Sequence, residues 1–238
     1  MRPRVNLIVA AFLTTAAFSS AQTVDPSKLF KSDAKNNVSD TDVVSGLKEA
    51  LKIGSDNTVS LTGKTDGYFS NEAIKILMPE KLGSIEKGLR AVGQGEKVDS
   101  FVLSMNRAAE KAAPAAKSIF WDAITGMSFE DARKILGGGD TAATEYFRRK
   151  TGDALTAAFR PVVKDSMKDT GVVQQYDQLQ SAYQSVPFAS SLPSFDIEQY
   201  VVAKALDGLF LVLGQEERKI RTDPTARVTD LLKQVFGK

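Results

Sequence analysis

The most apolar stretch beyond residue 40, over 201–213, constrains the fold more than any other part of the chain. Lys204 and Asp207 are its only charged residues, and Asp196 precedes it where a helix N-cap is expected. A helix that is apolar on nearly every side is typical of the centre of a domain. The run is too short to span a membrane, which takes roughly 20 apolar residues. The sequence therefore predicts a central core helix near 196–221.

Apolar residues recur three and four positions apart along most of the remaining chain, with Gly, Pro, Ser and Asp between the periodic segments. This pattern predicts an all-α fold of about ten helices, arranged in antiparallel hairpins around the central helix, in one domain over 39–238. Ser39 or Asp40 is expected to begin the first helix. Ser128 and Asp131 have the spacing of a capping box and are expected to begin another.

Two places depart from simple helical periodicity. Residues 62–77 combine turn-forming residues with short apolar groups, which allows either a small β-ribbon or an ordered loop, the loop being favoured. Pro79 is then expected at the first position of the next helix. Pro161 lies inside an apolar-periodic segment over 154–167 and is expected to kink or split that helix.

The 238 residues contain neither histidine nor cysteine. A Ser-His-Asp triad, a His-ligated metal, a cysteine nucleophile, a disulfide and an iron–sulfur cluster are therefore excluded. Carboxylate, lysine, arginine, hydroxyl and amide chemistry remain available. We expect no cofactor and no metal site, and side-chain packing must stabilise the fold. The composition, 42% hydrophobic and 25% charged, is that of an ordinary soluble globular domain.

The N-terminus has the pattern of an export signal. Arg2 and Arg4 precede an apolar stretch, and small residues follow it just before Gln22. We therefore predict a cleavable signal peptide over 1–21 and a flexible N-terminal segment over 22–38. An uncleaved membrane anchor is the alternative, but the apolar stretch is shorter than a bilayer span. The predicted location is the bacterial periplasm, with secretion as the lesser possibility.

Cleavage after residue 21 would remove two arginines and no acid, leaving 29 basic residues against the 29 acidic ones. A neutral mature chain is not a general binder of polyanions. We therefore expect no nucleic-acid partner and no polybasic membrane patch, and we expect no transmembrane span in the mature chain.

One polar cluster is a candidate ligand site. Asn106, Arg107 and Glu110 are three or four residues apart on an expected helix, so they share one side of it. A guanidinium beside an apolar stripe can bind a carboxylate or phosphate. The alternative, which we favour, is a boundary salt bridge with a solvated face.

Two further groups are candidates for ligand binding. Arg148 and Arg149 follow two aromatic residues at an expected helix end, where cations either bind an anion or compensate the helix dipole. Tyr68 and Phe69 lie in the loop over 62–77, where aromatic rings either fill the core or form a contact surface or lid. In both cases the structural interpretation is the favoured one.

Charged residues also gather toward the C-terminus, where weak surface ion pairs are the expected interpretation. They are Glu216, Glu217, Arg218, Arg221, Arg227 and Asp230.

Several runs resemble the bacterial family named domain of unknown function 4197. They are RAVGQGEKVD at 90–99, MNRAAEKAAP at 105–114, EYFRR at 145–149 and KALDGLF at 204–210. The resemblance covers roughly 43–237. It implies a mostly helical, exported envelope protein, and it carries no reaction, ligand or functional residue over to this chain.

The leading functional hypothesis is a non-enzymatic binding or assembly protein of the bacterial envelope, whose partner is a hydrophobic small molecule or another envelope protein. The alternative is a carboxylate-dependent enzyme acting on periplasmic glycan, because one glutamate can serve there as general acid and base. Glu110 is the first choice for that role and Glu72 the second. No catalytic residue is assigned with the leading hypothesis.

Overall fold

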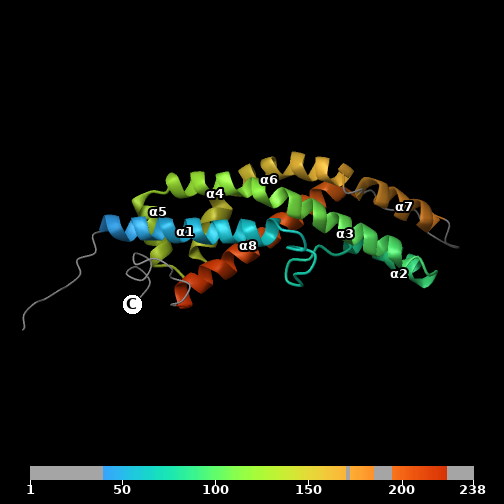
Figure 1. Ribbon diagram of the computed structural model, residues 1–238, viewed down its shortest axis with the longest axis horizontal. Coiled ribbons are helices and arrows are strands. Elements are labelled where there is room, and N and C mark those ends of the chain that lie inside the picture. The colour runs from blue at the N-terminus through green and yellow to red at the C-terminus, as the bar shows by residue number, and fades with distance from the viewer. Residues whose placement is uncertain (1–39, 170–171, 185–194, 224–238) are drawn as a thin grey trace, which may run out of the picture. The chain divides into compact units, whose positions relative to one another are not determined.

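The computed structural model describes residues 40–169, 172–184 and 195–223, which all lie within one compact unit. This part of the chain is all-helical and contains no strand (Figure 1). The signal peptide and N-terminal segment predicted from the sequence lie outside it. The elements in chain order are α1 (Asp40–Gly63), the 3-10 helix η2 (Glu80–Leu82), α2 (Gly83–Ala91), α3 (Gly95–Ala112), the 3-10 helix η3 (Ala113–Ala115), α4 (Ala116–Thr125), α5 (Phe129–Leu136), α6 (Ala142–Asp169), α7 (Val172–Gln184) and α8 (Ile197–Thr222).

Within this unit the helices form elongated rows: α1 and the row from α6 to α7 run in one direction, whereas the row from α2 to α4 and α8 run in the opposite direction (Figure 1). The first row is α1, the second runs from α2 through α3 to α4, the third from α6 to α7, and the fourth is α8. α8 packs against α1, α3 and α6, while α4 packs between α1 and α6. Each row thereby buries its apolar side against two or more others.

α8 contains the apolar run that the sequence placed at the centre. Val201, Ala205 and Leu209 are fully buried, and Asp196 caps the helix by accepting a hydrogen bond from the Gln199 N–H at 2.9 Å. However, Leu211 is 44% exposed, so the helix is not enclosed on every side. The buried side of α8 therefore faces α1, α3 and α6, and another side faces solvent.

α6 is continuous through residues 148–153, where the sequence pattern suggests a break between a helix over 140–147 and the one over 154–167, and Pro161 does not split it. A buried side chain occurs at every fourth residue along its length: Phe147, Thr151, Leu155, Phe159 and Val163. Proline inside a helix costs about 3 kcal/mol, whereas each large apolar side chain contributes about 1.5–3 kcal/mol on burial. The continuous buried face outweighs the proline. The described residues hold fewer α-helices than the ten expected because two expected helices join in α6 and because the last one, expected over 228–236, lies outside the described residues.

Other helix boundaries follow the sequence closely. α1 begins at Asp40 as expected, and Leu61 near its end is 40% exposed. The capping box at α5 is confirmed, because Ser128 Oγ accepts from the Asp131 N–H at 3.1 Å and the Ser128 N–H donates back to Asp131 at 3.3 Å. Pro79 lies just before η2 rather than within a helix.

The interior combines small and aromatic side chains. Ala108, Ala109 and Ala112 on α3 are fully buried, so the neighbouring helices can approach α3 closely. Phe120 on α4 contacts Phe147 on α6 edge to face, with ring centroids 5.1 Å apart. These contacts join α3, α4 and α6 in a single core.

Residues 64–79 form an ordered loop between α1 and η2, as favoured, and the alternative β-ribbon is absent from it. Asp66 has a positive φ of 65°. A Cβ on Gly67 would lie 2.4 Å from the carbonyl oxygen of Leu61 and 2.7 Å from that of Thr62. Only glycine therefore fits where the loop turns back against the end of α1.

Candidate functional site

Glu110 on α3 holds the first half of this loop. Glu110 as a whole is 4% exposed, and its Oε1 accepts hydrogen bonds from the Tyr68 and Phe69 N–H groups at 3.1 Å each. Its Oε2 accepts from Arg107 Nη1 at 2.7 Å, while Arg107 Nη2 donates to Asp66 at 2.6 Å. The hydrogen bond to Glu110 is the main reason that the pKa of Arg107 is raised. Both carboxylate oxygens of Glu110 are therefore engaged within the chain.

Asn106, one turn earlier on α3, holds the second half of the loop. Its Oδ1 accepts from the Ile76 N–H, and its Nδ2 donates to the Ile76 carbonyl, both at 2.8 Å. The same Nδ2 donates to the Val102 carbonyl at 2.8 Å. Asn106 is fully buried, and these bonds satisfy its amide without water.

The two loop aromatics lie in different environments. Tyr68 is fully buried and donates its hydroxyl to the Ala205 carbonyl at 2.6 Å, so it fills the core. Burial raises its pKa strongly, with a further contribution from the Glu110 charge. Phe69 is half-buried, with Lys75 Nζ 4.4 Å from its ring centroid.

The structure thus brings together five of the candidate residues: Asn106, Arg107, Glu110, Tyr68 and Phe69. Their hydrogen bonds secure the loop 64–79 on α3 and α8. Ligand binding by this group stays a prediction. Glu72, the second choice for a catalytic acid, is exposed in the same loop.

Arg148 and Arg149 lie apart from that cluster and inside α6, not at a helix end. The interpretation of these cations as compensation of a helix C-terminus is therefore wrong. Arg148 stacks over the Phe210 ring at 4.5 Å and pairs with Asp207 at 3.6 Å. Arg149 lines a separate hollow of about 280 Å³ that also contains Asp131, Lys134 and Glu145.

The charged C-terminal region contains a buried group that we did not foresee. Glu217 is 7% exposed and accepts hydrogen bonds from the Ala143 N–H at 2.9 Å and the Thr144 N–H at 2.8 Å. It therefore caps the N-terminus of α6 from α8. Arg221 pairs with the same carboxylate at 2.9 Å. Arg227 and Asp230 lie outside the described residues.

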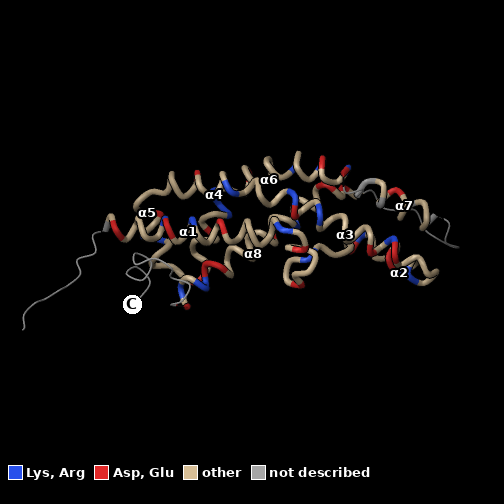
Figure 2. The backbone as a smooth tube through the Cα atoms, viewed as in Figure 1, with Lys and Arg blue, Asp and Glu red and all other residues tan. Residues whose placement is uncertain are grey.

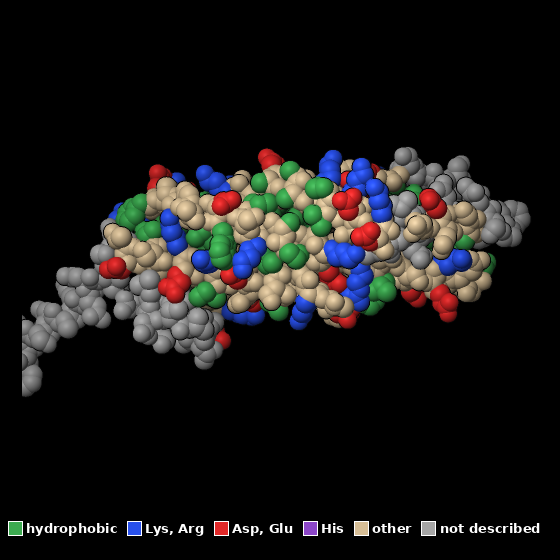
Figure 3. Space-filling model, turned by 45° about the horizontal axis from the view of Figure 1, so that its top comes forward, with side chains coloured by type: hydrophobic (Ala, Val, Ile, Leu, Met, Phe, Trp, Pro, Cys, Tyr) green, Lys and Arg blue, Asp and Glu red, His purple; other side chains and the backbone are tan. Residues whose placement is uncertain are grey.

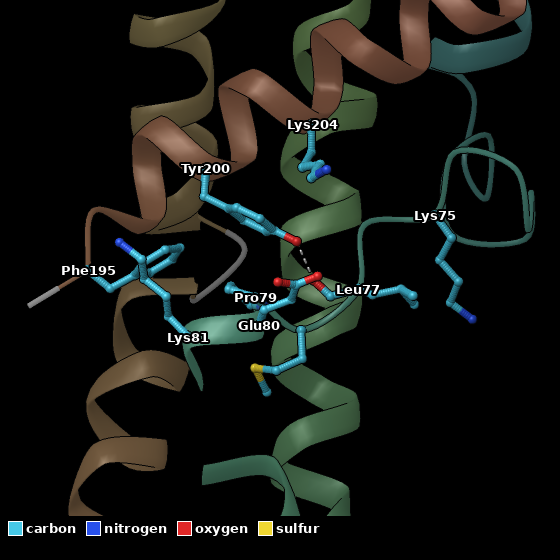
Figure 4. Close-up of a pocket in the computed structure, with 9 residues that line it drawn as sticks. Lys75, Leu77, Pro79, Glu80, Lys81, Phe195, Tyr200 and Lys204 are labelled. Atoms are coloured by element: carbon cyan, nitrogen blue, oxygen red, sulfur yellow. Dashed lines mark hydrogen bonds between the residues drawn. The ribbon is translucent and has the colours of Figure 1, made fainter. Parts of the chain in front are cut away.

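Outside that cluster, a pocket of about 530 Å³ lies between the loop and α8 (Figure 4). This volume is within the range of small-ligand sites, roughly 300–1,000 Å³. Its wall combines apolar and charged side chains: Lys75, Leu77, Met78, Pro79, Glu80, Lys81, Phe195, Tyr200 and Lys204. Leu77 is 60% exposed, so the pocket has an apolar group at an open edge.

Two aromatic rings and two ammonium groups lie side by side in this pocket. Phe195 and Tyr200 have ring centroids 5.6 Å apart. Lys81 Nζ lies 6.0 Å from the Phe195 ring, and Lys204 Nζ lies 6.0 Å from the Tyr200 ring. Lys75 points away from Tyr200 in Figure 4 and is placed over Phe69 instead. Lys81 and Lys204 are therefore the cations nearest the aromatic wall.

The balance of charge at the pocket is positive. Three lysines line it against one carboxylate, Glu80, and none of the three forms an ion pair within the described residues. Burial raises the pKa of Tyr200, and the Glu80 charge raises it further. Elsewhere acidic and basic residues are mixed along the helices (Figure 2), and they also lie next to one another on the face shown in Figure 3.

Tyr200 links the two sides of the pocket. Its hydroxyl donates to the Leu77 carbonyl at 3.1 Å, across from α8 to the loop (Figure 4). None of the pocket residues was among the sequence candidates. The sequence did contain one indication of the pocket, because Lys204 is the only basic residue in the apolar run over 201–213.

The match to known families agrees with the resemblance noted from the sequence. Residues 37–237 match the family described as "Protein of unknown function (DUF4197)". The chain belongs to this family. No curated protein and no solved structure matches this DUF4197 chain.

Neither a membrane-spanning helix nor a metal-binding cluster occurs in the described residues. No helix there combines the length and the apolarity needed to cross a bilayer. In the same residues, no three carboxylates cluster closely enough to hold a metal ion.

Proposed function

We propose that this protein is a non-enzymatic binding protein that takes a ligand with both an anionic and an apolar part. The ligand occupies the pocket between the loop and α8. The observation that carries the proposal is the placement of Lys81 and Lys204 beside the Phe195 and Tyr200 rings. Binding pockets combine apolar surface with well-placed polar groups. Both are present here, where charged side chains alternate with apolar and aromatic ones.

The charged and the apolar side chains of the pocket bind different parts of the ligand. The ammonium groups of Lys81 and Lys204 contact the anionic group of the ligand through charge-assisted hydrogen bonds. The aromatic rings and Leu77 cover its apolar part and remove that surface from water. Glu80 also lines the pocket, and its charge opposes the anion and offsets part of the attraction from the lysines.

We propose the bacterial envelope as the place of this activity. The support is the N-terminal sequence, in which two arginines, an apolar stretch and small residues precede Gln22 in the order of a cleavable export signal. Metabolic labelling followed by cell fractionation tests this directly. A shortened chain in the periplasmic fraction is the expected result, and a full-length chain in the cytoplasm would contradict it.

Calorimetric titration with octanoate and with octanol tests the binding proposal, because the two probes share an alkyl chain and differ in charge. We expect octanoate to bind at least about tenfold more tightly, a difference of about 1.4 kcal/mol. Lys204→Gln should remove most of this preference. Lys164→Gln, which alters an exposed lysine on α6, is the matched control and should leave it unchanged. Equal affinity for both probes, or no binding of either, would refute the proposal.

A further inference from the structure

The loop segment that lines the pocket has the burial pattern of an extended chain. Ile74 and Ile76 are buried, and Met78 is partly buried against the core, whereas Lys75 is half-buried and Leu77 is 60% exposed. Alternation of this kind is typical of a strand, in which successive side chains point to opposite faces. No strand pairs with this segment in the described part of the chain. A side-chain amide takes that place, because Asn106 pairs with both backbone groups of Ile76.

The opposite edge of the segment is open toward α8. In an extended chain the backbone groups of neighbouring residues point to opposite edges, so the groups of Leu77 point away from Asn106. The Leu77 carbonyl faces α8, since it accepts from the Tyr200 hydroxyl. The Leu77 N–H donates to no acceptor within the described residues. A carbonyl has two lone pairs, so that of Leu77 can accept a second hydrogen bond.

We infer that the ligand of this pocket is an acidic peptide segment in extended conformation, which adds as a strand along Leu77. This inference rests on the proposed function and names the class of its ligand. Strand addition draws affinity from backbone hydrogen bonds and specificity from alternate side chains. A peptide carbonyl accepts from the Leu77 N–H, and a peptide N–H donates to the Leu77 carbonyl. The carboxylates of the peptide pair with Lys81 and Lys204.

Asn106 acts as a positioning residue in this arrangement. It is fully buried and does not touch the ligand, but it fixes the backbone of Ile76 and so orients the Leu77 edge. Glu110 fixes only the other half of the loop, at Tyr68 and Phe69. Variants of Asn106 and Glu110 can therefore be compared: the first disturbs the loop at the pocket edge, and the second disturbs it away from the pocket.

Titration of the isotopically labelled protein with blocked peptides tests the inference by NMR. The probe is acetyl-Glu-Val-Glu-Val-amide, and the control is the same peptide with N-methyl groups on both valines. We expect the probe to shift the Leu77 amide resonance and slow its hydrogen exchange, and the N-methylated peptide to bind at least about tenfold more weakly. Leu77→Pro removes the donor and should weaken the probe similarly, whereas Leu77→Ala keeps the N–H and should weaken it less.

The outcomes separate the inference from the proposed function. If octanoate binds and the peptide does not, or if both peptides bind equally, strand addition is refuted and the anionic pocket stands. If neither octanoate nor the peptide binds, both proposals fail. The peptide pair alone decides the question if Leu77→Pro does not fold.

The positioning role of Asn106 is tested by comparing the affinities for the peptide and for octanoate. Asn106→Asp keeps the Oδ1 acceptor and loses the donor to Ile76, so it should weaken the peptide more than octanoate. Glu110→Gln should leave the affinity ratio of the two ligands unchanged. An equal effect of Asn106→Asp on both ligands would show that Asn106 has only a structural role.

Discussion

The Tyr68 ring lies against Gly208, where a side chain would leave it no room. A Cβ at Gly208 would be 2.7 Å from Cε1 of Tyr68 and 3.0 Å from Cβ of Ile74. Real Cβ contacts are longer than this, so glycine at 208 is what allows the loop to pack on α8. The contact explains how a segment without regular structure becomes part of the core.

Gly208→Ala should destabilise the protein by about 1–3 kcal/mol, because the added methyl group overpacks the site. Gly152→Ala is the control, since a Cβ there meets nothing within 4 Å. Gly152 lies inside α6, so its replacement should stabilise the helix by about 0.5–1 kcal/mol. Urea unfolding of both variants measures the difference. Two variants of equal stability would mean that the loop does not pack on Gly208 as described.

Stability should fall above about pH 10 because of Tyr68. Burial raises the pKa of Tyr68 in the folded protein, whereas in the unfolded chain the hydroxyl ionises near its ordinary value of about 10. The stability that this group contributes is therefore complete below about pH 10 and decreases as the pH rises further. For one proton the decrease is about 1.4 kcal/mol per pH unit.

Tyr68→Phe isolates this effect. At neutral pH the variant should lose about 0.5–1.5 kcal/mol with the hydrogen bond to Ala205. The difference from the unmutated protein should shrink above pH 10, since only the latter loses stability there through residue 68. Tyr146 and Tyr200 also have raised pKa values and remain in both proteins, so their contributions cancel. If the difference in the free energy of unfolding between the two proteins stayed constant up to pH 11, the Tyr68 hydroxyl would not be buried as described.

Glu110 variants should affect stability in a definite order. Glu110→Ala leaves the Tyr68 and Phe69 N–H groups without an acceptor and should lower the free energy of unfolding by about 1–3 kcal/mol or more. Glu110→Gln keeps an acceptor oxygen and should be less severe. Glu96→Ala removes an exposed glutamate from the same helix and should change little.

The same variants address the glycan-acting alternative. In a peptidoglycan zymogram we expect no clearing by the unmutated protein, because Glu110 is fully engaged with the loop and with Arg107. Clearing that disappears in a folded Glu110→Gln variant would show that this carboxylate is catalytic after all.

Glu217→Ala should fray the start of α6. It removes the shared acceptor of the Ala143 and Thr144 N–H groups, which is expected to cost about 1–3 kcal/mol. Hydrogen exchange at these two amides should quicken more than exchange in the middle of α6. Glu145→Ala, which removes an exposed carboxylate from the same helix end, should leave both amides slow.

Local patterns predicted the all-helical class and several helix starts. The capping box at Ser128, the start of α1 and the cap at Asp196 depend on residues that are close in sequence, so their hydrogen bonds can be read from spacing alone. The expectation that Pro161 splits its helix rested on the free-energy cost of a proline inside a helix, which can be read from the sequence alone. The buried face that outweighs this cost depends on α3, α4 and α8, which pack against α6.

The site was less predictable. The spacing of Asn106, Arg107 and Glu110 indicated a shared helix face, but their partners lie about 30 to 40 residues away in the loop. The pocket joins the 75–81 segment to residues 195–204, and Tyr200 reaches Leu77 across 123 positions of sequence. No local pattern specifies such a pairing, which arises only when α8 packs beside the loop.

The most direct test of the anionic pocket compares octanoate affinity in Glu80→Gln and Lys204→Gln by calorimetry. Both variants replace a charged lining residue with an amide, but the first removes the opposing charge and the second removes an attracting one. We predict that Glu80→Gln binds octanoate several-fold more tightly than the unmutated protein and that Lys204→Gln binds it about tenfold more weakly. Changes in the same direction, or no change in either variant, would contradict the account.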